Sequence, residues 1–260
     1  MKKQQRLILA LVVLFLAACS DDVKTPADIY KGQSAETIFN GGEASLAKGS
    51  YQDAVDRFEG LDALYPFSPY EEQSQLNIIY AYYKTNDYAM SAAAADRFIH
   101  LYPRSSHVDY AYYMKGVANT TVNRGLGSGI VQLDISTRDL GSVKEAFNDF
   151  NQLVLNYPYS PYAPAARSRM IYLRNTLAQS ELNIAQFYYD HRAYVAAANR
   201  ANDVVKDYQQ APAVIPALAL MVKSYRQLDL EEPANKALQV LAYNYPDSPE
   251  YKALMENKKS

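Results

Sequence analysis

The cysteine at position 19 is the residue whose type and surroundings indicate chemistry most directly. It is the only cysteine in the sequence, and it follows Leu16-Ala17-Ala18. Small residues here let a peptidase approach the backbone, and the thiol after them can accept a diacylglyceryl group. This pattern is a lipobox. We therefore predict that Cys19 becomes the lipidated N-terminus of a lipoprotein, held on a membrane by acyl chains such as palmitate.

The segment before the cysteine has the composition of a signal peptide. A basic start precedes an apolar run over residues 7–16. About 12 apolar residues rise only ~18 Å as a helix, less than the ~30 Å hydrocarbon core of a bilayer. We therefore assign residues 1–18 to a signal peptide, with an ordinary signal cut after Ala18 as the alternative. Residues 19–32 are expected to form a flexible lipidated tether.

The residue after the cysteine indicates the destination. Bacterial lipoproteins with Asp at this place are usually retained in the inner membrane, whereas this chain has Ser20. We therefore expect an anchor in the outer membrane, on its periplasmic face. Asp21 and Asp22 follow closely and weigh slightly against this destination.

No other residues have the spacing of a catalytic, cofactor or metal site. The three histidines lack cysteine or acidic partners at metal-ligand spacing. A glycine-rich run at 125–129 lacks the Gly-Lys-Ser/Thr of a phosphate loop, and no strand precedes it. After it, Asp134, Arg138 and Asp139 form a charged cluster. These residues either cap the next helix or contact a partner, and we expect no enzyme, no metal and no cofactor.

Charge and composition exclude two further classes. The chain has 26 basic and 28 acidic residues, and removing the three basic residues of the signal leaves 23 against 28, or −5. Nothing resembles a basic patch for nucleic acid. With one cysteine there is no intramolecular disulfide, so stability must come from packing. The 24 tyrosines and the absence of tryptophan indicate tyrosines at repeated positions.

Those tyrosines mark an internal repeat. Tyr-Pro steps begin at Tyr65, Tyr102, Tyr157 and Tyr245, with a degenerate fifth at Tyr208-Gln209. Fourteen residues before each tyrosine lie five start positions, at Tyr51, Tyr88, Val143, Tyr194 and Glu231. Positions three after the starts are small, and positions seven after them are apolar. Steps of 3, 7 and 14 share one face of a helix, so each unit ends in an amphipathic helix.

The segments between these helices carry their own signals. The proline that follows the tyrosine ends a helix. The serine three residues after the tyrosine is a good N-cap for the next helix. Ser68 with Glu71 also matches a capping box. Gly49, Asn86 and Gly141, two residues before three of the starts, predict the other turn. Each unit thus consists of two helices.

The spacing between starts is uneven. It is 37, 55, 51 and 37 residues. The 55-residue spacing contains the glycines, which predict a loop over 119–141 that is functional or mobile. The 51-residue spacing has no such breaks, so the first helix of repeat four is expected to be about 14 residues longer than the others, or ~21 Å.

These patterns predict an all-α fold, a superhelical solenoid of five tetratricopeptide (TPR) repeats over residues 33–257. The repeats are expected at about 33–67, 68–104, 105–159, 160–210 and 211–257. Tyrosines gather in the first helices of repeats two and three, at 80, 82, 83, 110, 112 and 113. They either fill the core between helices or line a groove for an extended or helical peptide.

With the lipobox and repeats in place, the chain resembles the BamD family, TPR lipoproteins of the outer-membrane β-barrel assembly (BAM) machinery. The resemblance covers about residues 28–250. Its specific stretches are Tyr65-Pro66-Phe67-Ser68-Pro69-Tyr70, Ile79-Tyr80-Ala81-Tyr82-Tyr83-Lys84, Asp96-Arg97-Phe98-Ile99, Asp109-Tyr110 with Tyr113-Met114, and Asp134 and Ser136 with Arg138-Asp139.

The resemblance implies a non-enzymatic scaffold that helps to assemble and insert β-barrel proteins. Implied partners are a POTRA domain of the barrel protein BamA, the lipoproteins BamC and BamE, and unfolded outer-membrane proteins. Arg200 matches the family's BamA-facing arginine. Tyr65 matches a tyrosine implicated in function, and Asp134, Arg138 and Asp139 are further partner or substrate candidates. Alternatively, Arg200 is a solvated helix residue and Tyr65 only a core residue.

A second function is a periplasmic TPR adaptor for envelope or cell-division proteins. Such adaptors usually lack a lipobox and carry a coiled coil, whereas this chain has a lipobox and no sustained heptads. An enzyme would need a catalytic domain, for which the repeats leave no room.

Overall fold

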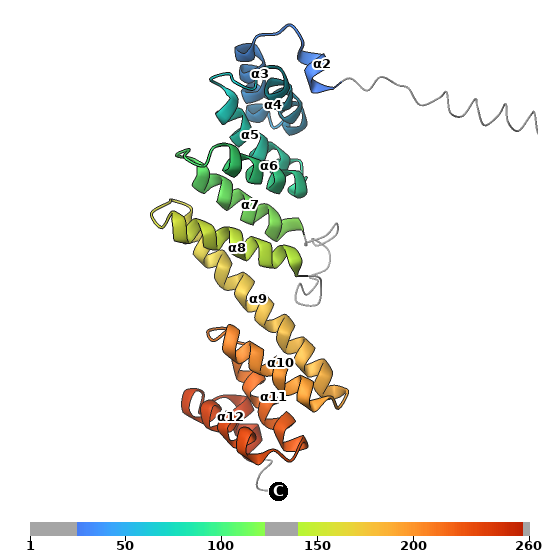
Figure 1. Ribbon diagram of the computed structural model, residues 1–260, viewed down its shortest axis with the longest axis vertical. Coiled ribbons are helices and arrows are strands. Elements are labelled where there is room, and N and C mark those ends of the chain that lie inside the picture. The colour runs from blue at the N-terminus through green and yellow to red at the C-terminus, as the bar shows by residue number, and fades with distance from the viewer. Residues whose placement is uncertain (1–24, 123–139, 257–260) are drawn as a thin grey trace, which may run out of the picture. The chain divides into compact units, whose positions relative to one another are not determined.

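The structure is a computed structural model that describes residues 25–122 and 140–256, and within these ranges the regular elements are helices (Figure 1). The chain divides into two compact units, one ending at Thr85 and the other beginning at Asn86. The predicted all-α class and the TPR-type pairing of helices are confirmed. Cys19 and the cluster of Asp134, Arg138 and Asp139 lie outside the described residues.

The first unit is built around one central helix. Its elements are α2 (Pro26–Tyr30), α3 (Ala35–Lys48), α4 (Tyr51–Leu64) and α5 (Glu71–Lys84). Helix α4 packs against each of the other three. Its apolar face is fully buried at Ala54, Phe58 and Leu61, as the 3.6-residue period predicts.

Helix α2 corrects one expectation. Residues 26–30 were expected to belong to a flexible tether, but they form a helical turn with a capping box between Thr25 and Asp28. Tyr30 is buried against α4, where Gly60 leaves room for its ring. Because burial of an aromatic side chain stabilises the contact, this segment is part of the folded unit.

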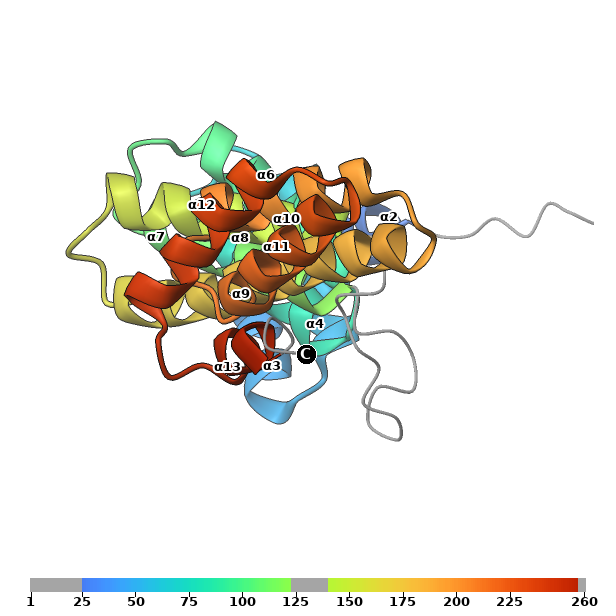
Figure 2. The same cartoon turned by 90° about the horizontal axis from the view of Figure 1, so that it is seen from below.

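The second unit continues the helix pairs. Its elements are α6 (Tyr88–Leu101), α7 (Val108–Val122), α8 (Gly141–Asn156), α9 (Ala163–Asp190), α10 (Tyr194–Asp207), α11 (Val214–Gln227), α12 (Glu231–Asn244) and α13 (Pro249–Glu256). From α6 to α12, each helix packs on the next along the chain. Helix α11 also contacts α9, and α13 closes this end against α11 and α12 (Figure 2).

The predicted helix face is the packed face. Each small residue three positions after a start has no exposed surface, namely Ala54, Ser91, Ala146, Ala197 and Ala234. Two of the positions seven after a start are phenylalanines that lie on a glycine of the paired helix. A Cβ on Gly42 would lie 2.5 Å from the ring of Phe58, and one on Gly116 would lie 2.7 Å from that of Phe150. Glycine therefore sets how closely these helices approach.

The link after each repeat is a hydrogen-bonded turn. Each repeat tyrosine is the C-cap of its helix, and its carbonyl accepts the N–H of the residue three positions on, Ser68, Ser105, Ser160, Ala211 or Ser248. Proline suits the second position of such a turn. The link that lacks proline forms the same turn, because the N–H of Ala211 donates to the carbonyl oxygen of Tyr208 over 2.8 Å.

The predicted capping box at Ser68 and Glu71 is wrong. Helix α5 begins at Glu71 after a second turn, and its N-cap is Tyr70. The Ser68 hydroxyl is buried without a hydrogen-bond partner among the described residues. Ser248, in contrast, caps α13 directly through the N–H of Tyr251, with Pro249 as the first helical residue.

The turn inside four of the repeats uses a left-handed residue. The predicted turns at Gly49 and Asn86 are confirmed, with φ of 76° and 65°, and Arg192 and Asp229 take the same conformation at the same position, two before their starts. The sequence gives no signal at Arg192, since arginine rarely adopts this conformation. Gly141 was expected to mark this turn but is the first residue of α8.

Two predictions concern the irregular spacings. Helix α9 has 28 residues against 14 for α3, α5 and α11, so the predicted extension is confirmed. The expected loop over 119–141 is too long at both ends. Asn119 to Val122 continue α7, where Asn119 and Thr120 are buried, and Gly141 already belongs to α8.

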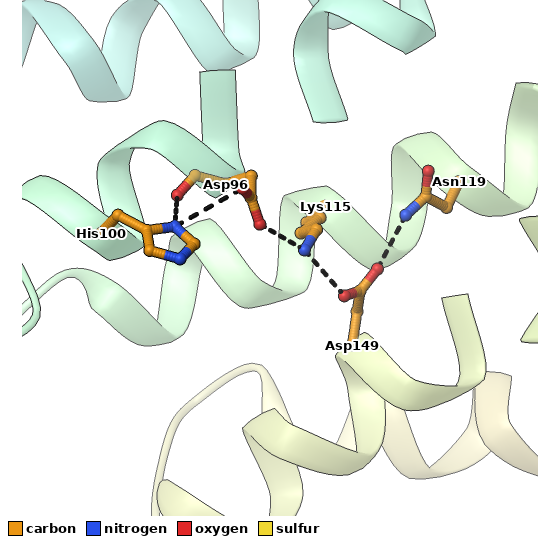
Figure 3. A network of polar contacts seen from close by, with 5 residues as sticks. All are labelled: Asp96, His100, Lys115, Asn119 and Asp149. Carbon is orange, nitrogen blue, oxygen red and sulfur yellow. Dashed lines mark hydrogen bonds and ion pairs between the residues drawn. The ribbon is translucent and has the colours of Figure 1, made fainter. Parts of the chain in front are cut away.

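A polar network that is buried at one end joins α6, α7 and α8 (Figure 3). The Lys115 ammonium lies 2.6 Å from a carboxylate oxygen of Asp96 and 3.4 Å from one of Asp149. Asn119 donates to the other oxygen of Asp149 over 2.8 Å. His100 extends the network to the surface, with its Nδ1 2.8 Å from the Asp96 carbonyl oxygen. One lysine on α7 thus serves carboxylates of both neighbouring helices.

Burial disfavours the charged forms of Asp149 and Lys115, and their hydrogen bonds and opposite charges favour these forms. Burial raises the pKa of Asp149, although Lys115 and Asn119 act to lower it. Burial alone would lower the pKa of Lys115, but the hydrogen bond to Asp96 and the charge of Asp149 raise it. Lys115 faces two carboxylates, whereas Asp149 faces one ammonium. The raised pKa of Lys115 adds stability that is complete below pH 10.5 and is lost as pH rises through the folded pKa.

We expect Lys115→Met to lower the free energy of unfolding by about 3 kcal/mol, because it leaves the Asp149 carboxylate buried without its counter-charge. Urea unfolding followed by circular dichroism measures this change. A matched control is Lys236→Met, which removes a pair exposed on both sides and should change stability by less than about 0.5 kcal/mol. Adding Asp149→Asn to Lys115→Met should restore part of the loss. Equal effects of the two lysine substitutions would contradict the expectation.

Candidate functional site

The predicted partner residue Arg200 lies on α10 and forms an ion pair within the chain. Its Nη1 is 3.2 Å from a carboxylate oxygen of Glu181 on α9. The Arg200 side chain is 45% exposed and that of Glu181 is 23% exposed. An ion pair at this exposure contributes little to stability because water screens it. The pair therefore leaves the guanidinium available to a second carboxylate.

The extended helix α9 positions this pair. Glu181 lies in the second half of α9, which is the half that extends the repeat. On the same helix, Ile184 is one turn further and partly exposed, and Phe187 is 57% exposed beside His191. The exposed part of α9 thus combines an ion-paired carboxylate with exposed apolar side chains, and arginine and aromatic residues are common at protein interfaces.

Tyr65 takes part in the packing of the first unit. Its hydroxyl donates to the backbone carbonyl of Gln33 over 2.6 Å, which fastens the start of α3 to the end of α4. Its ring packs against the cluster of Tyr30, Ile38 and Leu61. The contacts give Tyr65 a structural role, and its predicted role toward a partner or substrate stays a prediction.

Most tyrosines of the first helices are partly buried, and several pack on other aromatic rings. Tyr82 is buried, and the rings of Tyr110 and Tyr113 pack on Tyr162, the latter stacked at 5.1 Å. Tyr80 is partly exposed. These rings thus contribute to packing between helices while most keep part of their surface exposed.

The structure describes no metal cluster. Within residues 25–122 and 140–256, no three His, Cys, Asp or Glu side chains lie close enough together to hold a metal ion. In the same part of the chain, none of the helices combines the length and apolar character needed to cross a membrane.

Comparison with known proteins decides the family. Residues 31–241 match YfiO, a family described as an outer membrane lipoprotein. The chain belongs to this family. Two relatives bear the name outer membrane protein assembly factor BamD. The one from Pasteurella multocida is 36% identical over 236 residues, 91% of this chain and 89% of the relative. The one from Vibrio cholerae is 35% identical, and the match covers 91% of this chain and 96% of the relative.

The predicted resemblance to BamD is therefore confirmed, and with it the assignment to an outer membrane lipoprotein family. Among solved structures, the chain is similar to the MamA protein, with 13% identity and a TM-score of 0.37. The match covers 84% of this chain and 98% of MamA. That similarity is too weak to support a functional argument.

Sequence reasoning missed the partner that Arg200 already has. Glu181 lies 19 residues before Arg200, so no local pattern connects them. Only the packing of α10 on α9 brings the two side chains together. The predicted helix extension was a signal that the surroundings of Arg200 would be unusual.

We expect Tyr65→Phe to loosen the first unit by about 1 kcal/mol, because the Gln33 carbonyl loses its donor while the ring still packs. Hydrogen exchange of the α3 and α4 amides should become about fivefold faster. Tyr243→Phe is the matched control, since Tyr243 is 88% exposed. Unchanged exchange in Tyr65→Phe would argue that the hydroxyl has no structural role.

Proposed function

We propose that this chain is a non-enzymatic outer-membrane lipoprotein scaffold of the BAM complex, which helps to assemble and insert β-barrel proteins. The observation that carries the proposal is its similarity to BamD assembly factors over about nine tenths of its length. Paired helices with buried faces suit a scaffold, since they leave long surfaces for other proteins. Anchoring through Cys19 would hold this scaffold at the periplasmic face of the membrane.

Arg200 is proposed to bind a carboxylate on a POTRA domain of BamA. Its side chain is half-exposed, and its present partner Glu181 lies on one side of the guanidinium. The guanidinium has five N–H donors, so it can keep its hydrogen bond to Glu181 and donate to a second carboxylate as well. Glu181 would then hold Arg200 in place for the partner. BamC, BamE and unfolded barrel proteins are further proposed partners, and Tyr65, Asp134, Arg138 and Asp139 are proposed contacts on their side.

Arg200→Glu should reduce recovery of the POTRA-barrel protein at least tenfold when the tagged full chain is purified in mild detergent. The substitution places a carboxylate beside Glu181 and opposite the partner's carboxylate, and like charges there oppose binding. Lys223→Glu makes the same charge change at an exposed position of α11 and should leave recovery unchanged. Full recovery with Arg200→Glu would reject this residue as a contact. Absence of the barrel protein from the unmodified preparation would reject the proposed function itself.

The lipid anchor has a separate test. Cys19→Ala should abolish labelling by radioactive palmitate and move the protein from the outer-membrane fraction to a precursor or soluble fraction. An alanine lacks the thiol that accepts the lipid, while the signal sequence stays intact. Labelling that persists in Cys19→Ala would show that lipid is attached elsewhere, and an unlabelled wild-type chain would favour an ordinary signal cut.

A further inference from the structure

The extension of α9 opens a cavity in the second unit. Helix α8 lies along the first part of α9, and α10 lies along the second part (Figure 1). Between them is an open pocket of about 390 Å³, which we call the α8–α10 pocket. It is lined by Lys144 and Phe147 of α8, Arg174 and Leu177 of α9, and Asp207 and Tyr208 at the end of α10. None of these residues belongs to the Arg200 site.

The pocket has apolar walls and a positive balance of charge. Phe147 and Tyr208 are partly exposed aromatic side chains, and Leu177 is buried. Among the lining residues, the two cations Lys144 and Arg174 stand beside one carboxylate, Asp207. Burial and then the nearby charge of Glu181 raise the pKa of Tyr208, but Glu181 is paired with Arg200. An aromatic side chain that entered the pocket could pack against the rings of Phe147 and Tyr208. A carboxylate beside it could pair with Lys144 or Arg174.

Arg174 is held in place at the wall of the pocket. Its Nη1 donates to the side-chain oxygen of Gln210 over 2.9 Å, and its Nη2 lies 3.4 Å from the Gln210 carbonyl oxygen. Its Nη2 also lies 3.4 Å from the side-chain oxygen of Asn175, so the guanidinium is fixed by neighbouring polar groups and carries its charge at the wall of the pocket. Gln210 belongs to the link that lacks the repeat's proline, so this irregular link positions the arginine. A guanidinium that is already held in place loses little freedom when a carboxylate binds beside it.

We propose that the α8–α10 pocket binds a segment of a partner protein that inserts one aromatic side chain and sets a carboxylate beside Arg174 and Lys144. The volume lies near the lower end of the range for ligand sites, roughly 300–1,000 Å³, and suits a side chain better than a large cofactor. The open mouth admits a peptide backbone along the surface. This site uses other residues than the proposed contact of Arg200, although Glu181, the partner of Arg200, lies near Tyr208.

A defined peptide tests the proposal with the full chain in detergent. The probe is the amidated peptide Gly-Ser-Glu-Phe-Ser-Gly with a fluorophore on its N-terminus, and fluorescence anisotropy measures binding. We expect saturable binding that weakens at least tenfold when the peptide's Phe is replaced by Ala or its Glu by Gln. Higher salt should weaken binding of the Glu peptide more than that of the Gln peptide.

Two variants locate the site. Lys144→Glu changes an exposed side chain, and Arg174→Met removes the half-buried guanidinium; each should weaken binding at least tenfold. Lys236→Glu, at an exposed position of α12, should leave binding unchanged. Circular dichroism checks that the helices are kept. The proposal is overturned by the absence of saturation at millimolar peptide, by equal binding of the Ala peptide, or by equal affinity of all three variants. Lys144→Glu should leave recovery of the barrel protein intact, so failure here is distinct from failure of the proposed function.

Discussion

The close approach of the two helices within a repeat is the constraint on which the other features depend. Gly42 and Gly116 lie so near Phe58 and Phe150 that a Cβ would collide with the ring. Glycine inside a helix costs about 1 kcal/mol relative to alanine. The burial of a whole phenylalanine side chain more than offsets this cost. Once the separation is set, the short turns between helices have few ways to close.

Those turns follow from the packing. At Gly49, Asn86, Arg192 and Asp229 the chain reverses through one left-handed residue, and between repeats it reverses through a hydrogen-bonded turn after the tyrosine. Arg192 adopts the left-handed conformation although its side chain disfavours it. The turn after Tyr208 forms without proline. Tertiary packing therefore imposes these turns even where local preference is absent.

Helix α9 breaks the regularity, and the unusual features of the second unit gather around it. Because α9 is twice as long as α10, it contacts α8 with one part and α10 and α11 with the other. The Arg200–Glu181 pair and the α8–α10 pocket both lie along it. A regular repeat would bury these surfaces against the next repeat. The added stretch of helix thus leaves charged side chains of α9 and α10 at the surface of the second unit.

The sequence by itself determined the helices, their packed faces, the tyrosine caps and the extra length of α9, because each is set by local periodicity or by the geometry of proline. It also carried the family through motifs spread along most of the chain. Only the tertiary structure decided which charged groups meet. Lys115 reaches Asp96 across 19 residues, and Arg174 reaches Gln210 across 36. Such pairs depend on how helices pack, for which a periodic pattern contains no information.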